Sequence, residues 1–153
     1  MSGAKERLAE LGLTLPPVTP PLAAYIPAVQ TGNLVFVSGQ VPIADGQLLA
    51  TGKVGAEVTP ERAKELAARC ALQGLAALDD LVGLERVVRI VKVVGFVAAA
   101  DGFTAVPDVI NGASEFLADV LGEAGRHARS AVGVYQLPRN VPVEVELIAE
   151  VSA

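Results

Sequence analysis

The chain has 153 residues, of which 52 % are hydrophobic, 19 % charged and 4 % aromatic, and its formal net charge is −5. This length and apolarity predict one domain with a core of Val, Leu, Ile and Ala, and they exclude a disordered protein. Twelve basic residues stand against seventeen acidic ones, without a basic run. We expect no nucleic-acid partner, because phosphate binding depends on Lys and Arg. The low charged fraction indicates that other copies of the chain cover some apolar surface.

The sequence contains one cysteine, Cys70, and one histidine, His127. Such a pair cannot build a Cys/His zinc site, so we expect no metal. Cys70 is interpreted as a buried thiol, and His127 as a solvated loop residue rather than a member of a Ser-His-Asp triad. The start of the chain lacks the apolar segment of a secretory signal, and Arg89 and Lys92 interrupt the most apolar stretch, 87–100. These features predict a cytoplasmic protein that does not span a membrane.

The N-terminal part predicts a short helix followed by an irregular strap. The helix runs from Ala4 to Leu11, and Gly12 ends it at the C′ position. The proline-rich segment that follows must be extended or irregular, and we expect it to lie over the domain. We therefore assign residues 1–24 to the helix and strap, and residues 25–153 to a single domain.

The next elements are a strand, a hairpin and a long helix. The strand covers residues 33–38, and the dipeptide Asp45-Gly46 indicates a tight turn after it. Thr59 caps a helix in which apolar residues recur at helical spacing as far as Leu78. Because charged residues occupy its opposite side, this helix is expected to pack on a sheet.

The second half predicts a central strand at 86–97, a helix at 106–121 closed by Gly122, and strands at 130–136 and 143–151. The order of elements predicts an α+β fold in which two helices cover one face of a mixed sheet. Since the chain has no third long helix to cover the other face, we expect homo-oligomerisation through that face.

Three places could carry chemistry, and each also has a structural interpretation. Ser38 and Gly39 end a buried strand, where they could approach a ligand or form a turn. The Arg129 guanidinium could hold a carboxylate or form a surface ion pair. Partial desolvation would suit Glu144 to acid–base chemistry, although it is also one of three glutamates on one strand face.

The relative position of Arg129 and Glu144 restricts where a shared site could lie. If the last two strands pair as a hairpin around Arg139 and Asn140, these side chains lie about 20 Å apart at ~3.3 Å per residue. On that geometry they could share a site only across an interface between copies of the chain.

Several short motifs occur in a characteristic order from about Tyr25 to the C-terminus. They are Tyr25, Thr31-Gly32-Asn33, Ser38-Gly39-Gln40, Asn111, Ala128-Arg129-Ser130, Leu137-Pro138 and Val143-Glu144-Val145-Glu146. In this pattern the chain resembles the RidA/YjgF family, also called the L-PSP endoribonuclease or translation-inhibitor family. With its N-terminal helix and proline strap, it is most similar to a longer branch of that family.

The resemblance implies a chorismate-mutase-like fold, assembled as a homotrimer with clefts between subunits. It also implies hydrolytic deamination of reactive 2-imino and 2-enamino acids to 2-keto acids and ammonia, without a cofactor. By the same resemblance, Arg129 binds the substrate carboxylate and Glu144 positions or activates water. Ala131 stands where several deaminating members have a cysteine. The other residues at cleft-lining positions are Tyr25, Ser38, Gly39 and Asn111.

Two further functions stay open at this point. A trimer of this kind could bind small carboxylates without turning them over. The older names of the family suggest RNA cleavage or inhibition of translation, against which the acidic charge balance argues. The sequence names neither the substrate nor a heterologous protein partner.

Overall fold

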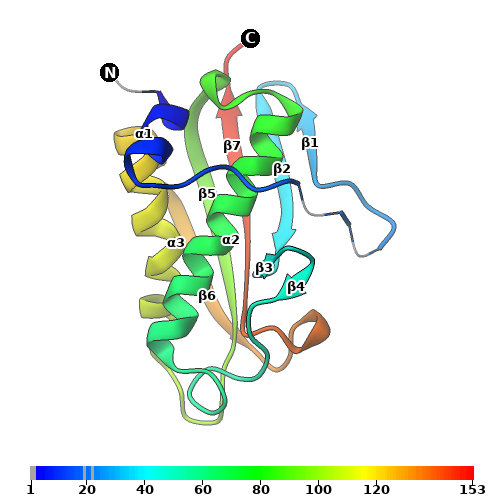
Figure 1. The fold of residues 1–153 in the computed structure, drawn as a ribbon, viewed down its shortest axis with the longest axis vertical. Coiled ribbons are helices and arrows are strands. Elements are labelled where there is room, and N and C mark those ends of the chain that lie inside the picture. Colours follow the sequence, from blue (N-terminus) through cyan, green and yellow to red (C-terminus); the bar gives the residue numbers. More distant parts are fainter. Residues whose placement is uncertain (1–2, 19, 22) are drawn as a thin grey trace.

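The computed structural model describes residues 3–18, 20–21 and 23–153, and its centre is a five-stranded sheet (Figure 1). Strands β5 and β6 run parallel, and the other neighbouring pairs are antiparallel, so the sheet is mixed as predicted. In spatial order the strands are β1 (Ala28–Thr31), β2 (Leu34–Gln40), β7 (Val143–Val151), β5 (Val87–Ala98) and β6 (Ala128–Val134).

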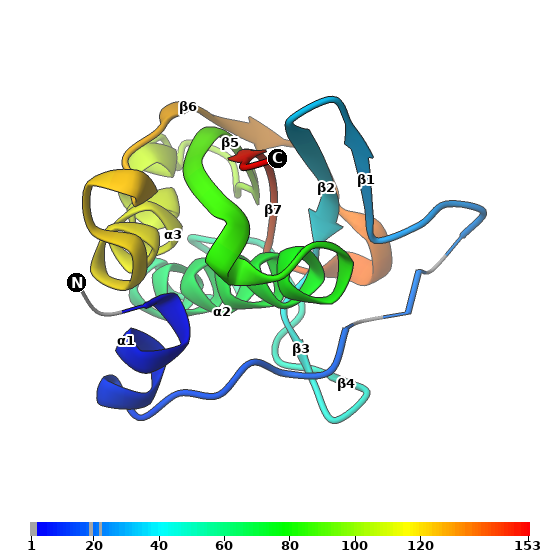
Figure 2. The same cartoon turned by 90° about the horizontal axis from the view of Figure 1, so that it is seen from above.

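Two long helices, α2 (Pro60–Leu81) and α3 (Val106–Leu121), cover one face of this sheet (Figure 2). The Thr59 hydroxyl caps α2 by accepting a hydrogen bond from the Arg62 amide at 3.1 Å. The two helices touch at Gly112, where a Cβ would collide with the Lys64 carbonyl, and Lys64 forms an ion pair with Glu115. The predicted two-helix layer is confirmed.

The N-terminal segment forms an outer layer over the helices. Helix α1 (Ala4–Glu10) buries Leu8, and Gly12 follows it with a φ of +75°. The strap then crosses α2 toward β1 (Figures 1 and 2), and Leu13 and Leu15 pack against the core. The described N-terminal residues thus form a short helix followed by an irregular strap, while the division of the chain after residue 24 stays a prediction.

A small hairpin follows β2, as the Asp45-Gly46 turn signal predicts. It consists of β3 (Ile43–Ala44) and β4 (Gln47–Leu48), and both turn residues have a positive φ. Strand β1 was not predicted, because a four-residue strand with three exposed residues carries little periodic signal.

The predicted hairpin of the last two strands is wrong. Strands β6 and β7 lie on opposite sides of β5 and do not pair with each other. Helix α3 carries the chain from β5 to β6 as a parallel crossover. The turn η3 (Pro138–Asn140) then leads to β7, which pairs antiparallel with β5. Strand β5 lies between β7 and β6, so the prediction of a central strand at 86–97 is confirmed.

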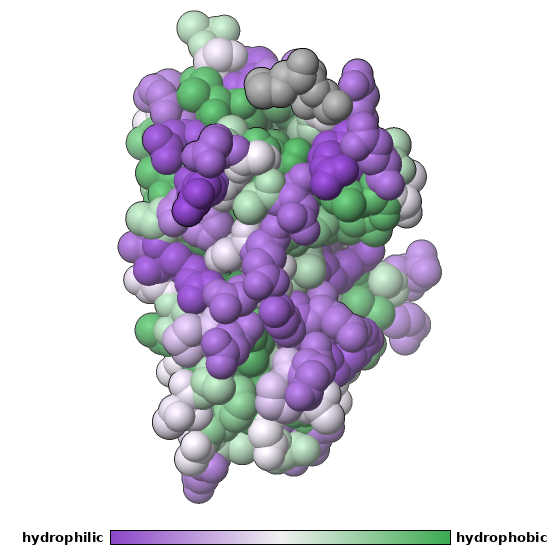
Figure 3. All heavy atoms as spheres, turned by 90° about the vertical axis from the view of Figure 1, so that its left-hand side faces the viewer, coloured by the Kyte–Doolittle hydropathy of each residue, from purple (hydrophilic) through white to green (hydrophobic). Residues whose placement is uncertain are grey.

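The face of the sheet opposite the helices has no covering element among the described residues (Figure 2). It carries exposed apolar side chains, among them Phe36 (40 % exposed), Val132 (44 %) and Val29 (50 %). On the side formed by α1 and α3, polar and apolar residues are interspersed (Figure 3). The open sheet face therefore offers an apolar surface for association, while the homotrimer stays a prediction.

No helix within the described ranges is long and apolar enough to cross a membrane.

Candidate functional site

The predicted site residues lie in two separate hollows of the chain. Tyr25, Ser38, Gly39 and Glu144 line a hollow of about 770 Å³ at the end of β2 and the start of β7. Asn111 and Arg129 line a second hollow of about 610 Å³ between α3 and β6. Within one chain, the predicted residues therefore form two separate groups, one in each hollow, and not a single site.

Arg129 and Glu144 lie on opposite faces of the sheet. In the strand register, Arg129 lies beside Val93, which in turn lies beside Leu147, and these apolar side chains face the helices. Arg129 is therefore on the helix-covered face. Glu144 is level with Phe96, on the open face. The two side chains therefore cannot meet within one chain, as inferred, although the hairpin from which a separation of about 20 Å was derived is wrong.

A β-bulge shapes the first hollow. Between Val37 and Gln40 the register of β2 against β7 shifts by one residue, and Ser38 and Gly39 occupy the bulge. The Glu144 carboxylate packs directly on Gly39, where a Cβ would collide with it. Bulges recur beside active sites because they redirect a strand locally. Here the bulge and the bare glycine backbone make room for a carboxylate.

The environment of Glu144 alters its acidity. Burial raises the pKa of this carboxyl above its ordinary value of 4.5, and the neighbouring charge of Glu146 raises it further. A carboxyl whose pKa moves toward neutrality can both accept and return a proton at working pH. The sequence-based expectation of a partly desolvated Glu144 therefore matches its place in the structure.

Hydrogen bonds hold the walls of this hollow. The Ser38 hydroxyl donates to the Ile26 carbonyl at 2.6 Å, which ties the Tyr25 segment to β2. Helix α2 holds the chain beyond the bulge, because the buried Gln73 amide donates to the Val41 carbonyl at 2.7 Å. The proton of Ser38 is therefore used within the fold, and this residue shapes the wall.

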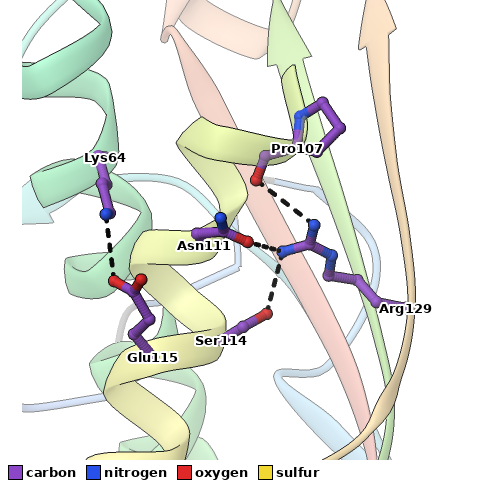
Figure 4. Close-up of polar contacts among 6 residues, drawn as sticks. All are labelled: Lys64, Pro107, Asn111, Ser114, Glu115 and Arg129. Carbon is purple, nitrogen blue, oxygen red and sulfur yellow. Dashed lines mark hydrogen bonds and ion pairs between the residues drawn. The ribbon is translucent and has the colours of Figure 1, made fainter. Parts of the chain in front are cut away.

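In the second hollow, Arg129 reaches from β6 to the near side of α3 (Figure 4). Its Nη1 donates to Asn111 Oδ1 at 2.8 Å and to Ser114 Oγ at 3.2 Å. Its Nη2 makes a longer contact of 3.4 Å with the Pro107 carbonyl. Both Nη1 protons are thus engaged, whereas Nε–H and one Nη2 proton have no partner among the described residues. Two free N–H groups on a guanidinium match the two oxygens of a carboxylate.

His127 is not the solvated loop residue that the sequence suggested. It is half-buried, and its ring nitrogens contact Ser114 Oγ at 2.9 Å and the Gly125 carbonyl at 2.6 Å. The sequence analysis missed Ser114 altogether. Its spacing of three residues from Asn111 would have placed both side chains on one side of a helix.

Neither a reactive cysteine nor a metal cluster is found among the described residues. Cys70 is fully buried, and burial raises the pKa of its thiol, as expected of an inert core cysteine. Within the part of the chain that the structure describes, no group of three or more His, Cys, Asp or Glu residues could hold a metal ion.

A family model described as Endoribonuclease L-PSP matches residues 17–151. The chain belongs to the endoribonuclease L-PSP family. The resemblance inferred from the motifs is therefore confirmed, and with it the mixed α+β fold typical of this family.

Three known proteins are similar to this chain over most of its length. Protein TCP17 of Trypanosoma cruzi is 41 % identical over 147 residues, which cover 95 % of this chain and 92 % of that protein. The 2-iminobutanoate/2-iminopropanoate deaminase of Escherichia coli is 33 % identical over 129 residues, covering 84 % and 88 %. A crystal structure of a protein of unknown function from Agrobacterium tumefaciens is 44 % identical, with a TM-score of 0.91 and coverage of 97 % and 92 %.

Proposed function

We propose that this protein hydrolyses 2-imino acids to 2-keto acids and ammonia, at sites formed between copies of the chain. The observation that carries the proposal is the guanidinium of Arg129, which is anchored through Nη1 while its Nε–H and one Nη2 proton have no partner in the described part of the chain. The similarity to a named 2-iminobutanoate/2-iminopropanoate deaminase supports the substrate class, because both named imines are 2-imino carboxylates.

In this proposal each site combines the first hollow of one copy of the chain with the second hollow of another copy. The first hollow contributes Glu144 on Gly39 beside Tyr25, and the second contributes Arg129 with Asn111. The exposed apolar residues of the open sheet face supply a surface through which copies could associate. Such a site between subunits also accounts for two half-sites on opposite faces of one sheet.

The chemistry requires an oriented water and one proton relay. Arg129 holds the carboxylate and thereby places the imine carbon, which is already electrophilic. Glu144 takes one proton from a water molecule while the water oxygen bonds to that carbon and the C=N electron pair moves to nitrogen, which then receives this proton from the Glu144 carboxyl. The Glu144 carboxylate next takes the remaining hydroxyl proton and passes it to the amino nitrogen, so the C–N bond breaks, ammonia leaves and the C=O bond forms. Water is the only co-reactant, and no electron transfer takes place.

A complementation experiment tests the sharing of sites between copies. Arg129→Ala and Glu144→Ala are purified alone and after co-expression, and keto-acid release is measured from 2-iminobutanoate generated by an amino-acid oxidase. Each variant alone should be inactive. In randomly mixed cyclic trimers, roughly a quarter of the interfaces would combine an intact Arg129 with an intact Glu144, so about a quarter of the wild-type activity should return.

The control is co-expression of Arg129→Ala with the double variant Arg129→Ala/Glu144→Ala, which leaves no intact interface. Mixed assemblies without recovered activity would overturn the shared site. If the wild type accelerates no imine hydrolysis, the deaminase proposal is wrong. Binding of a 2-keto acid by such an inactive protein would then favour the second candidate, a carboxylate-binding protein, because that function needs Arg129 but not Glu144.

A further inference from the structure

A chain of hydrogen bonds continues behind Arg129, on the side away from its free N–H groups. The Gly125 carbonyl contacts His127 Nδ1 at 2.6 Å, and His127 Nε2 contacts Ser114 Oγ at 2.9 Å. Ser114 Oγ in turn accepts a proton from Arg129 Nη1 at 3.2 Å, and the second Nη1 proton goes to Asn111. Four side chains from α3, β6 and the intervening loop therefore form one connected network.

The direction of each hydrogen bond follows from its neighbour. A carbonyl only accepts, so His127 Nδ1 must carry the proton that bonds to Gly125. In the neutral ring, Nε2 is then an acceptor, and the Ser114 hydroxyl must donate to it. This leaves a lone pair of Ser114 Oγ for Arg129. Every polar group of the network is satisfied only with neutral His127 in this one tautomer.

Burial and the nearby Arg129 guanidinium favour the neutral form of His127. Burial lowers the pKa of the ring and the Arg129 guanidinium lowers it further, whereas the hydrogen bond to Gly125 raises it. The other charged residues lining the same hollow are Arg126, Glu115 and Glu123.

The far end of the network packs against α3. The Gly125 carbonyl belongs to the turn η2 (Gly122–Gly125), which follows α3. A Cβ at Gly125 would collide with the Leu117 carbonyl, so this turn lies directly against the helix. Because the Gly125 carbonyl holds the His127 ring in place, the ring can hold the Ser114 hydroxyl, and that hydroxyl can hold the Nη1 end of the guanidinium.

We propose that Ser114 and His127 are positioning residues, which hold the Nη1 end of Arg129 and thereby present its free N–H groups to a substrate carboxylate. The proposal rests on the proposed function in so far as Arg129 binds that carboxylate. Ser114 is assigned this role rather than that of a nucleophile, because its oxygen already accepts a proton from a cationic group. A side chain with several rotatable bonds gains affinity when its bound geometry is fixed beforehand.

Three variants test the proposal. Glutamine can place an acceptor near the position of Nε2, whereas asparagine reaches only as far as Nδ1. We therefore expect His127→Gln to bind like the wild type, and His127→Asn and Ser114→Ala to bind 2-oxobutanoate about threefold to tenfold more weakly. Calorimetry with 2-oxobutanoate and with its methyl ester separates loss at the carboxylate from a general loss of binding. In turnover, KM should rise while kcat changes less.

The outcomes separate the two proposals. A wild type that binds 2-oxobutanoate no better than the ester overturns the role of Arg129, and this inference with it. A wild type that prefers the carboxylate, with His127→Asn and Ser114→Ala unchanged, overturns only the positioning network. Equal weakening for the carboxylate and the ester would mark both residues as structural and would also overturn it.

Discussion

The carboxylate of Glu144 lies so close to the backbone of Gly39 that a Cβ at this position would overlap its Oε2 atom. The contact joins β7 to the bulge of β2 and sets where the carboxylate stands in the first hollow. Because the far end of a flexible side chain can move away, an added methyl group would displace the carboxylate rather than break the fold.

Gly39→Ala should therefore lower kcat for imine hydrolysis by about tenfold or more, since misplacing a proton-transfer group forfeits part of its contribution. The melting temperature should change little. Gly133→Ala is the matched control, because a Cβ there meets its nearest neighbour at an ordinary 3.6 Å. Full activity in Gly39→Ala would show that the position of Glu144 does not matter for the reaction.

Arg129→Lys keeps the positive charge but loses the planar guanidinium. We expect KM for a 2-imino acid to rise about 10- to 100-fold, the effect of losing charge-assisted hydrogen bonds to the carboxylate. Arg129→Ala should weaken binding further and leave the assembly intact in sedimentation, because this residue lies outside the exposed apolar patch of the sheet. If Arg129→Ala dissociated into monomers, the residue would be structural and the site assignment wrong.

The raised pKa of Glu144 predicts a pH-dependent cost in stability. The unfolded chain ionises this group near 4.5, whereas the folded protein ionises it only at higher pH. The folded state therefore loses stability as the pH rises through this interval, and the loss is complete above the folded pKa. Glu144→Gln should melt at a higher temperature than the wild type near neutral pH, although its kcat falls about 100-fold.

The same comparison well below pH 4.5 supplies the control for Glu144→Gln. Both folded and unfolded wild-type chains are protonated there, so the difference in melting temperature should vanish. A difference that persisted unchanged at low pH would arise from packing and not from ionisation.

The open sheet face predicts the effect of a surface charge on assembly. Phe36 is 40 % exposed on this face, level with Ile148 of β7. Phe36→Glu should convert the assembly to monomers in sedimentation and abolish imine hydrolysis, because a buried unpaired charge costs several kcal/mol at an interface. Glu65→Gln, on α2 outside this face and outside both hollows, should change neither property. A monomeric wild type with full activity would contradict sites formed between copies.

Local sequence patterns were sufficient to predict most helices and strands of this protein. The periodicity of α2, the apolar run of β5 and the alternation of β7 each depend on neighbours in the sequence, and the structure confirms all three. The motifs around Arg129 and Glu144 were equally local, and they identified the family. For each of these features, the short-range physics of helix, strand and turn carries the information.

Only the tertiary structure decided how these elements combine. Nothing in the sequence of β6 and β7 says that β5 lies between them, since strand pairing depends on competition among all strands of the sheet. The bulge that seats Glu144 on Gly39, and the network from Gly125 through His127 to Arg129, join residues that are distant in the chain or separated by a turn. Such contacts arise when packed elements bring side chains together, so His127 looked like a loop residue until α3 and β6 were placed beside it.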